Sequence, residues 1–169
     1  MFINYNKSIM KQYTNIFIST TDTVVGIGAP MSKENEQKLF SIKNRPSNKP
    51  LLVMVSSIEE ARKFEGWNNN AEKLAQKYWP GQVTIIIGEI GIRIPNNKQL
   101  IELIKIKGPI YMTSANKSGD PTLDLEEAKK TFPEIKEVYD FGVGSKVAST
   151  IVRASDFKIF RQGSIKIEK

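Results

Sequence analysis

Three polar segments carry residues from which a site for a charged ligand could be built, and one of them lies at 113–119. This segment, Thr-Ser-Ala-Asn-Lys-Ser-Gly, directly follows the apolar run at 110–112, which predicts a buried strand that ends in short hydrogen-bonding side chains. Open α/β sheets place ligands at such strand ends, and hydroxyl and amide groups can orient a small polar ligand. An ordinary turn is the alternative interpretation of this segment by itself.

A second segment at 20–28 repeats this arrangement. Its sequence, Thr-Thr-Asp-Thr-Val-Val-Gly-Ile-Gly, follows the apolar run at 16–18 and therefore predicts another strand that leads into hydroxyl groups. We expect Gly26 and Gly28 to let the backbone approach a ligand closely, because glycine has no side chain. The pair is no dinucleotide-binding fingerprint, since the third glycine of that motif is missing.

The third segment is basic. Lys43, Arg45 and Lys49 lie within residues 43–49, and Pro46 and Pro50 predict an ordered loop in place of a helix face. Cations at this spacing could hold phosphate groups, while the hydroxyl and amide loops hold a polar substrate. A solvated basic turn is the alternative for this segment taken alone.

Taken together and in this order, the segments resemble the YrdC-like family, the threonylcarbamoyl-AMP synthases of tRNA modification. The resemblance covers nearly the whole chain. The matching motifs are residues 20–28, Lys43-x-Arg45-Pro46 with Lys49-Pro50-Leu51, Trp79-Pro80-Gly81-Gln82-Val83-Thr84, Ile92-Arg93-Ile94-Pro95, Ser114-Ala115-Asn116, Ser149-Thr150-Ile151-Val152 and Arg161-Gln162-Gly163.

The chain departs from the family pattern at three positions. Thr20 and Gln82 stand where the family usually has proline, and Val25 stands where it usually has tyrosine. Loss of a proline loosens a turn, and loss of the tyrosine removes a stacking or hydroxyl contact. The family's Lys-Arg-Ser-Asn set is intact, which favours activity.

The resemblance implies a reaction. L-threonine and bicarbonate form N-carboxy-threonine, whose carboxylate attacks the α-phosphate of ATP, so that pyrophosphate leaves and threonylcarbamoyl-AMP forms. It also implies Mg²⁺ bridging phosphate oxygens, with no metal held by the protein alone, because the chain has no dense carboxylate cluster. Expected partners are ATP, L-threonine, bicarbonate and the proteins that transfer the threonylcarbamoyl group to tRNA, and direct contact with tRNA stays open.

The same resemblance assigns the site residues. The expected catalytic residues are Lys43, Arg45, Ser114 and Asn116. The expected ATP-binding residues are Lys43, Arg45, Lys49, Asn116 and Arg161. The expected threonine-binding residues are Thr23, Arg93, Ser114 and Ser149. A strand-surface charge is the alternative for Arg93, and a simple turn hydroxyl is the alternative for Ser149.

The composition narrows the chemistry. The chain has no cysteine and no histidine, which excludes disulfides, thiol nucleophiles and imidazole bases and leaves positioning, hydroxyls, carboxylates and cations. Its net charge of +7 favours anionic ligands, either nucleotide or RNA, although a generally lysine-rich composition would give the same balance. An RNA-binding module without chemistry and a divergent relative acting on another carbamoyl compound therefore remain alternatives.

The 169 residues predict one domain, 1–169, without the extra C-terminal domain of longer relatives. Apolar runs such as 83–87 are too short to cross a membrane, and the N-terminus lacks the organisation of a signal peptide. We therefore expect a cytoplasmic protein with no membrane partner.

The resemblance predicts a mixed α/β fold in which a twisted mixed sheet with flanking helices surrounds a concave, positively charged cleft. Local patterns agree with alternating elements. Expected strands lie near 15–19, 51–55, 83–87, 91–94 and 110–113, with closing strands around 138, 151–152 and 158–160. Expected helices span 33–43 after Ser32, begin at a Ser57–Glu60 capping box, run from Asn70 to before Pro80, and cover 97–107 up to Gly108 and about 124–131.

Overall fold

The structure, a computed structural model, describes residues 2–44, 46, 51–117 and 119–168. Within these ranges the helices are α1 (Phe2–Tyr13), α2 (Lys33–Lys43), α3 (Ile58–Ala61), α4 (Asn69–Tyr78), α5 (Lys98–Lys107) and α6 (Leu125–Thr131). The strands are β1 (Phe17–Ser19), β2 (Gly26–Pro30), β3 (Leu52–Met54), β4 (Val83–Ile87), β5 (Ile90–Arg93), β6 (Ile110–Ser114), β7 (Glu137–Tyr139), β8 (Thr150–Arg153) and β9 (Ile159–Arg161).

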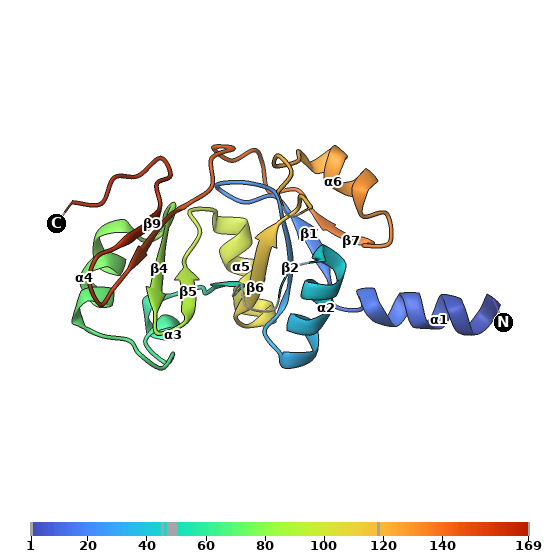
Figure 1. Cartoon of the computed structure of the whole chain (residues 1–169), viewed down its shortest axis with the longest axis horizontal. Helices are drawn as coiled ribbons and strands as arrows, with labels where there is room; N and C mark the ends of the chain where they lie inside the picture. Colours follow the sequence, from blue (N-terminus) through green and yellow to red (C-terminus); the bar gives the residue numbers. More distant parts are fainter. Residues whose placement is uncertain (1, 45, 47–50, 118, 169) are drawn as a thin grey trace.

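All these strands join one sheet in the order β7-β1-β2-β6-β3-β5-β4-β8-β9 (Figure 1). The sheet is mixed: β1 and β7, β3 and β5, and β4 and β8 run parallel, whereas the remaining neighbours run antiparallel. The predicted mixed α/β fold with a twisted mixed sheet is confirmed, and the neighbouring strands β4 and β5 form an antiparallel hairpin. The positive charge of the cleft stays a prediction.

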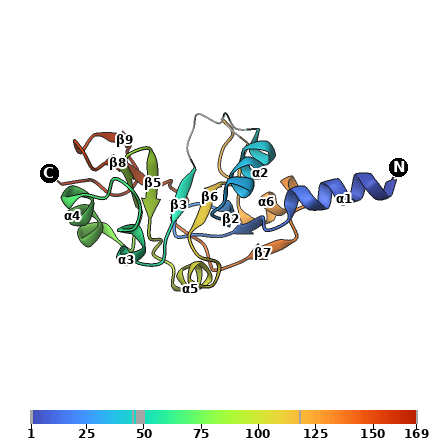
Figure 2. The same ribbon diagram turned by 90° about the horizontal axis from the view of Figure 1, so that it is seen from below.

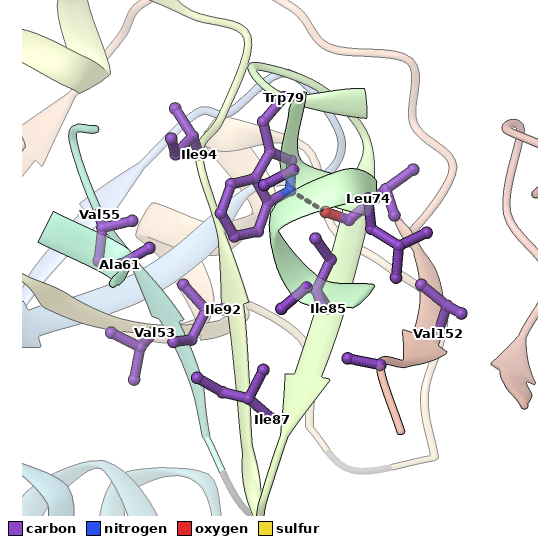
Figure 3. Close-up of a cluster of buried hydrophobic side chains, with 14 residues drawn as sticks. Val53, Val55, Ala61, Leu74, Trp79, Ile85, Ile87, Ile92, Ile94 and Val152 are labelled. Atoms are coloured by element: carbon purple, nitrogen blue, oxygen red, sulfur yellow. Dashed lines mark hydrogen bonds between the residues drawn. The ribbon is translucent and has the colours of Figure 1, made fainter. Parts of the chain in front are cut away.

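One hydrophobic core lies between α4 and the strands β3, β4, β5 and β8 (Figure 3). Alternate residues of each strand, such as Ile85, Ile92 and Val152, point into this core and are fully buried. Trp79 closes the end of α4 over them, and its indole Nε1 donates a hydrogen bond of 2.7 Å to the Val83 carbonyl. The opposite face of the same strands is therefore left for polar side chains.

The other half of the sheet is covered on both sides (Figure 2). Leu39 of α2 and Ala128 of α6 pack in one cluster with Ile18 of β1. Phe17, one residue earlier, points the other way and packs in a second cluster with Leu100 of α5. This alternation holds the sheet between helices and fixes where each strand ends.

Side-chain caps start the helices largely as predicted. Ser32 accepts a hydrogen bond from the Asn35 N–H at the start of α2. The capping box expected at Ser57 is only half formed, because the Glu60 carboxylate accepts from the N–H and hydroxyl of Ser56. The helix α4 begins earlier than the predicted start at Asn70: Asn68 is its cap, whereas Asn70 donates to the Ala154 carbonyl.

Two features of the N-terminal half differ from the sequence-based expectation. No helix is expected from the sequence before residue 14, yet α1 is a helix that extends away from the sheet (Figures 1 and 2). Gly26 and Gly28 lie within β2, where a Cβ at Gly28 would come 2.7 Å from the Phe17 ring and one at Gly26 would overlap the Met112 sulfur. These glycines make room for core side chains of neighbouring strands, a role that the sequence pattern did not indicate. A close approach of their backbone to a ligand stays a prediction. Among the described residues, no helix is long and apolar enough to span a membrane.

The burial pattern predicts a large difference between two Ile→Ala substitutions. Ile85 is fully buried between α4 and the sheet, whereas Ile106 is 82% exposed on α5. We expect Ile85→Ala to lower the free energy of unfolding by about 2–5 kcal/mol through lost contacts and a residual cavity. We expect Ile106→Ala to change it by at most about 0.5 kcal/mol. Urea unfolding of both variants measures the difference, and equal losses would contradict the assigned core.

Candidate functional site

A cavity of about 520 Å³ lies on the face of the sheet that α4 does not cover. Its floor consists of alternate residues of β3, β4, β5 and β8, and its walls are the loops that follow β1 and β6. Six residues predicted from the sequence line it: Thr23, Arg93, Ser114, Asn116, Ser149 and Arg161. Segments that are far apart in the chain are thus brought to one place.

The loop after β1 is shaped by its own hydroxyl groups. Thr21 Oγ1 accepts from the Thr23 N–H at 3.0 Å and donates to the Val24 carbonyl at 2.6 Å. The hydroxyls of Thr21 and Thr23 also lie 3.1 Å apart within hydrogen-bonding reach. These bonds turn the chain tightly and aim the Thr23 hydroxyl at the cavity.

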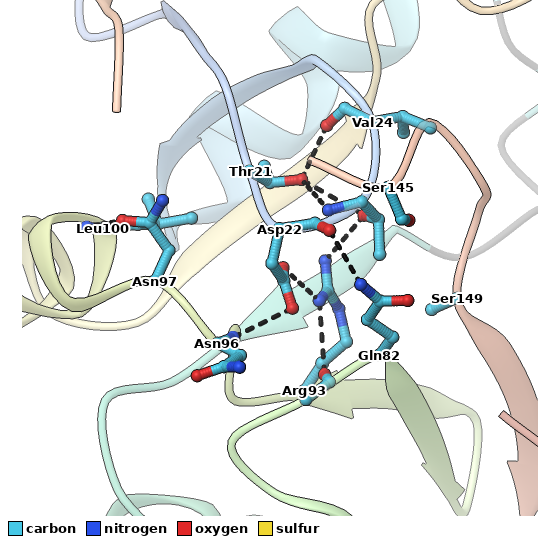
Figure 4. Close-up of polar contacts among 12 residues, drawn as sticks. Thr21, Asp22, Val24, Gln82, Arg93, Asn96, Asn97, Leu100, Ser145 and Ser149 are labelled. Carbon is cyan, nitrogen blue, oxygen red and sulfur yellow. Dashed lines mark hydrogen bonds and ion pairs between the residues drawn. The ribbon is translucent and has the colours of Figure 1, made fainter. Parts of the chain in front are cut away.

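Arg93, at the end of β5, is joined to this loop by a buried ion pair (Figure 4). Its Nη1 donates to Asp22 Oδ1 at 2.6 Å, and the exposed fractions of the two side chains are only 2% and 7%. Nη2 donates to Thr23 Oγ1 at 3.1 Å, and the second Asp22 oxygen accepts from the Asn96 N–H at 2.9 Å. The alternative of a strand-surface charge for Arg93 is therefore wrong, since the guanidinium is buried in the wall of the cavity.

The same loop is held from outside through its carbonyl oxygens. The Asp22 carbonyl accepts from Gln82 Nε2 at 2.9 Å and from the Ser145 N–H at 3.0 Å. The Thr23 carbonyl accepts from the Lys146 N–H at 2.9 Å. Gln82, one of the departures from the family pattern, thus supplies a tether between the turn before β4 and this loop.

A hydroxyl pair and a second guanidinium lie across the cavity floor from the loop. Ser149 Oγ is 2.8 Å from Thr84 Oγ1. Arg161 donates to the Ser149 carbonyl through Nε at 2.8 Å and to its hydroxyl through Nη2 at 3.2 Å. Desolvation and the nearby positive charge of Arg93 lower the pKa of Arg161. Arginine nevertheless stays charged, so two cations converge where an anion could bind.

The loop after β6 brings the Asn116 amide to the cavity. Asn116 Nδ2 donates to the carbonyls of Lys117 at 3.1 Å and Asp120 at 2.7 Å. Its Oδ1 is buried and, among the residues that the structure describes, has no hydrogen-bond partner. Lys43, at the end of α2, is also buried and donates from Nζ to the Ser114 carbonyl, but it is not among the residues that line the cavity. The α2 helix and the Ser-Ala-Asn loop are thereby joined.

Two predicted phosphate-binding residues, Arg45 and Lys49, lie outside the described residues. Among the described residues that line the cavity, Glu89 supplies the one carboxylate side chain. Within the described ranges, no group of three or more acidic side chains could hold a metal ion. These donors do not form a complete Mg²⁺ site, and Mg²⁺ remains a proposal as part of a nucleotide complex.

Several residues of the site had no role assigned from the sequence. Asp22 and Thr84 belong to the motifs at 20–28 and 79–84. The sequence signal that could have identified them is a polar side chain next to a glycine-rich or aromatic turn. Phe160 also lines the cavity, and nothing in its sequence context distinguished it from a core residue.

Comparisons with known proteins agree with this geometry. The family model for Sua5, YciO and YrdC proteins, described as "Telomere recombination", matches residues 12–163. A Methanocaldococcus jannaschii protein provisionally named a threonylcarbamoyl-AMP synthase is 36% identical over 172 residues, which cover 91% of this chain and 82% of that protein. The threonylcarbamoyl-AMP synthase of Pyrococcus abyssi is 28% identical over 173 residues, which cover 88% of this chain and 50% of that protein.

Two solved structures share the fold. Pyrococcus abyssi Sua5 complexed with L-threonine superposes with a TM-score of 0.79 at 24% identity, over 92% of this chain and 52% of that one. Escherichia coli YciO superposes with a TM-score of 0.78 at 21% identity, over 96% of this chain and 89% of that one. The chain therefore spans about half the length of the Pyrococcus relatives and most of the length of YciO.

The buried ion pair predicts that the site and the stability of the fold are linked. Asp22→Asn leaves the Arg93 guanidinium buried without a counter-charge, and we expect a loss of about 3–5 kcal/mol in the free energy of unfolding. Glu102→Gln breaks the exposed pair with Lys105 and should cost at most about 1 kcal/mol. Urea unfolding of both variants distinguishes these values, and an Asp22→Asn protein as stable as Glu102→Gln would show that the pair does not hold the loop.

Proposed function

The chain belongs to the Sua5/YciO/YrdC family, and on that premise we propose that it synthesises threonylcarbamoyl-AMP from L-threonine, bicarbonate and ATP. The observation that carries the proposal is the convergence in one cavity of two guanidinium groups, several hydroxyls and the Asn116 amide. A ligand that carries both a carboxylate and a phosphate needs such a mixed set of donors.

The threonine part of the ligand is proposed to bind beside Arg93, Thr23 and Ser149. Arg93 has five N–H donors, and the described residues accept from three of them: Asp22, Gly81 and Thr23. Two N–H groups, the buried Nε–H and one on Nη2, have no acceptor among the described residues and are proposed to donate to a ligand carboxylate, while the Asp22 pair holds the guanidinium in place. The hydroxyls of Thr23, Ser114 and Ser149 supply hydrogen bonds to the side chain and carbamate of the substrate.

The nucleotide part is proposed to bind Lys43, Arg45, Lys49, Asn116 and Arg161. Asn116 Oδ1 is a buried acceptor without a partner among the described residues. Leaving such an atom without a hydrogen bond costs free energy, so a hydrogen-bond donor of the nucleotide is proposed to bind there. ATP is taken as its Mg²⁺ complex, in which the metal reaches the site already held by phosphate oxygens. Lysine and arginine side chains then neutralise the charge that remains on the phosphates.

In the proposed reaction, the carboxylate oxygen of N-carboxy-threonine forms a bond to the α-phosphorus of ATP. The bond from that phosphorus to the oxygen bridging to the β-phosphate breaks, and pyrophosphate leaves with the electron pair. The protein's part is orientation and charge neutralisation, because no residue needs to form a covalent bond with the substrate.

The direct test is pyrophosphate release from ATP in the presence of bicarbonate, with L-threonine, with L-serine or with neither. Threonine-dependent release above the serine control is the expected result. Measurable ATP binding without threonine-dependent release would contradict the proposal and favour a relative that acts on another carbamoyl compound. RNA binding that falls steeply with salt, without nucleotide turnover, would favour a binding module.

Lys43→Ala is expected to lower threonine-dependent pyrophosphate release about a hundredfold, as loss of one charge-stabilising donor does in other active sites. Lys33→Ala is the matched control, because Lys33 is exposed at the opposite end of the same helix. Steady-state kinetics of both variants, with unfolding curves to verify the fold, provide the measurement. Wild-type rates for Lys43→Ala would refute its phosphate-binding role.

Ser114→Ala is expected to raise the KM for L-threonine several-fold more than the KM for ATP, because its hydroxyl is assigned to the threonine part of the ligand. Ser155→Ala, at an exposed turn, serves as the control and should leave both values unchanged. Equal changes in the two KM values would count against the assignment of Ser114.

A further inference from the structure

The cavity floor changes from polar to apolar along the strands. Thr84 and Arg93 lie at one level, next to Ser149. Two residues further along β4, about 7 Å away, Ile86 pairs with Gly91, which has no side chain. Ile151 of β8 adds a second aliphatic side chain to the floor. An apolar surface thus borders the two cations of the site directly.

Phe160 completes this apolar surface because β9 contains a bulge. Arg161 pairs with Ile151, and Ile159 pairs with Val152, so Phe160 is the extra residue between them. A bulge sets two residues of one strand opposite one residue of its partner and redirects their side chains. Both Phe160 and Arg161 consequently line the cavity, and the Phe160 ring remains 50% exposed.

The Phe160 ring also has cations around it. The Arg153 guanidinium carbon and the Lys158 Nζ each lie 5.1 Å from the ring centroid. Asp156 holds Arg153 in place through hydrogen bonds of 2.9 and 2.6 Å. Isolated exposed apolar residues need no explanation, but an exposed aromatic ring between cations at the edge of an anion site is typical of nucleotide and nucleic-acid binding.

We propose that Phe160, together with Ile86 and Ile151, forms the surface on which the base of the bound nucleotide stacks. The inference rests on the proposed function, in which ATP is the nucleotide, and it adds the residue that recognises the base. Arg161 connects the two parts of the ligand, since it follows Phe160 in the chain and donates to Ser149. The aromatic ring provides affinity for a flat base and little selection among bases, because every base offers a π-face.

The test compares the binding of MgATP and of magnesium tripolyphosphate, which has no base, to the whole chain by titration calorimetry. We expect Phe160→Ala to weaken MgATP binding about tenfold, the loss typical of one stacked base, and to leave tripolyphosphate binding unchanged. Phe160→Trp keeps a stacking surface and should retain the affinity for MgATP. Ile159→Ala is the matched control, because Ile159 is 37% exposed on the same strand and does not line the cavity.

The outcomes separate this inference from the proposed function. Equal MgATP affinity of wild type and Phe160→Ala would overturn the stacking surface, even if threonine-dependent pyrophosphate release is normal. Weaker MgATP binding by Phe160→Ala would support it, even if no such release occurs. A Phe160→Ala protein that loses affinity for single-stranded RNA and keeps its affinity for MgATP would assign the ring to RNA binding and overturn the inference. A wild-type protein that binds no MgATP would also overturn it.

Discussion

The buried ion pair between Asp22 and Arg93 is the interaction on which the rest of the site depends. It joins the loop after β1 to the end of β5, two positions 71 residues apart in the chain. Burying two charges costs several kcal/mol, and the pair is tolerated only because further hydrogen bonds complete it, including those from Asn96 and to Thr23. Its contribution is therefore geometric: it determines where the loop lies over the sheet.

This loop needs such support because it separates two cavities. Besides the cavity over the sheet, a second one of about 490 Å³ lies between α6 and the segment at 140–146. Thr21, Thr23, Val24 and Thr122 line both. A wall only one chain thick has little side-chain packing behind it, so hydrogen bonds and the ion pair must hold it in shape. The hydrogen bonds and the ion pair clustered at residues 20–24 supply this support.

The departures from the family pattern act on the same loop. The Thr20 N–H donates to the Tyr139 carbonyl at 3.1 Å, and its hydroxyl accepts from the Phe141 N–H at 2.7 Å. A proline at this position has no N–H and no hydroxyl, so neither bond could form. Gln82 similarly provides an amide that bonds to the Asp22 carbonyl. These side-chain hydrogen bonds restrict the conformation of the loop, as the rigid ring of proline would at the same positions.

The sequence by itself determined most of the local elements, though not α1 or β2, and much of the inventory of the site. Alternating or continuous apolar runs defined most strands, caps such as Ser32 and Ser57 defined helix starts, and the ordered motifs named six residues that meet in the cavity. It did not determine which partners those residues would take. Strand order and register bring distant segments together. They place Asp22 opposite Arg93 and Ser149 opposite Thr84, and they produce the bulge that turns Phe160 toward the cavity. Local propensity cannot encode such contacts, because a shift of one residue in register reverses the face to which every side chain of a strand points.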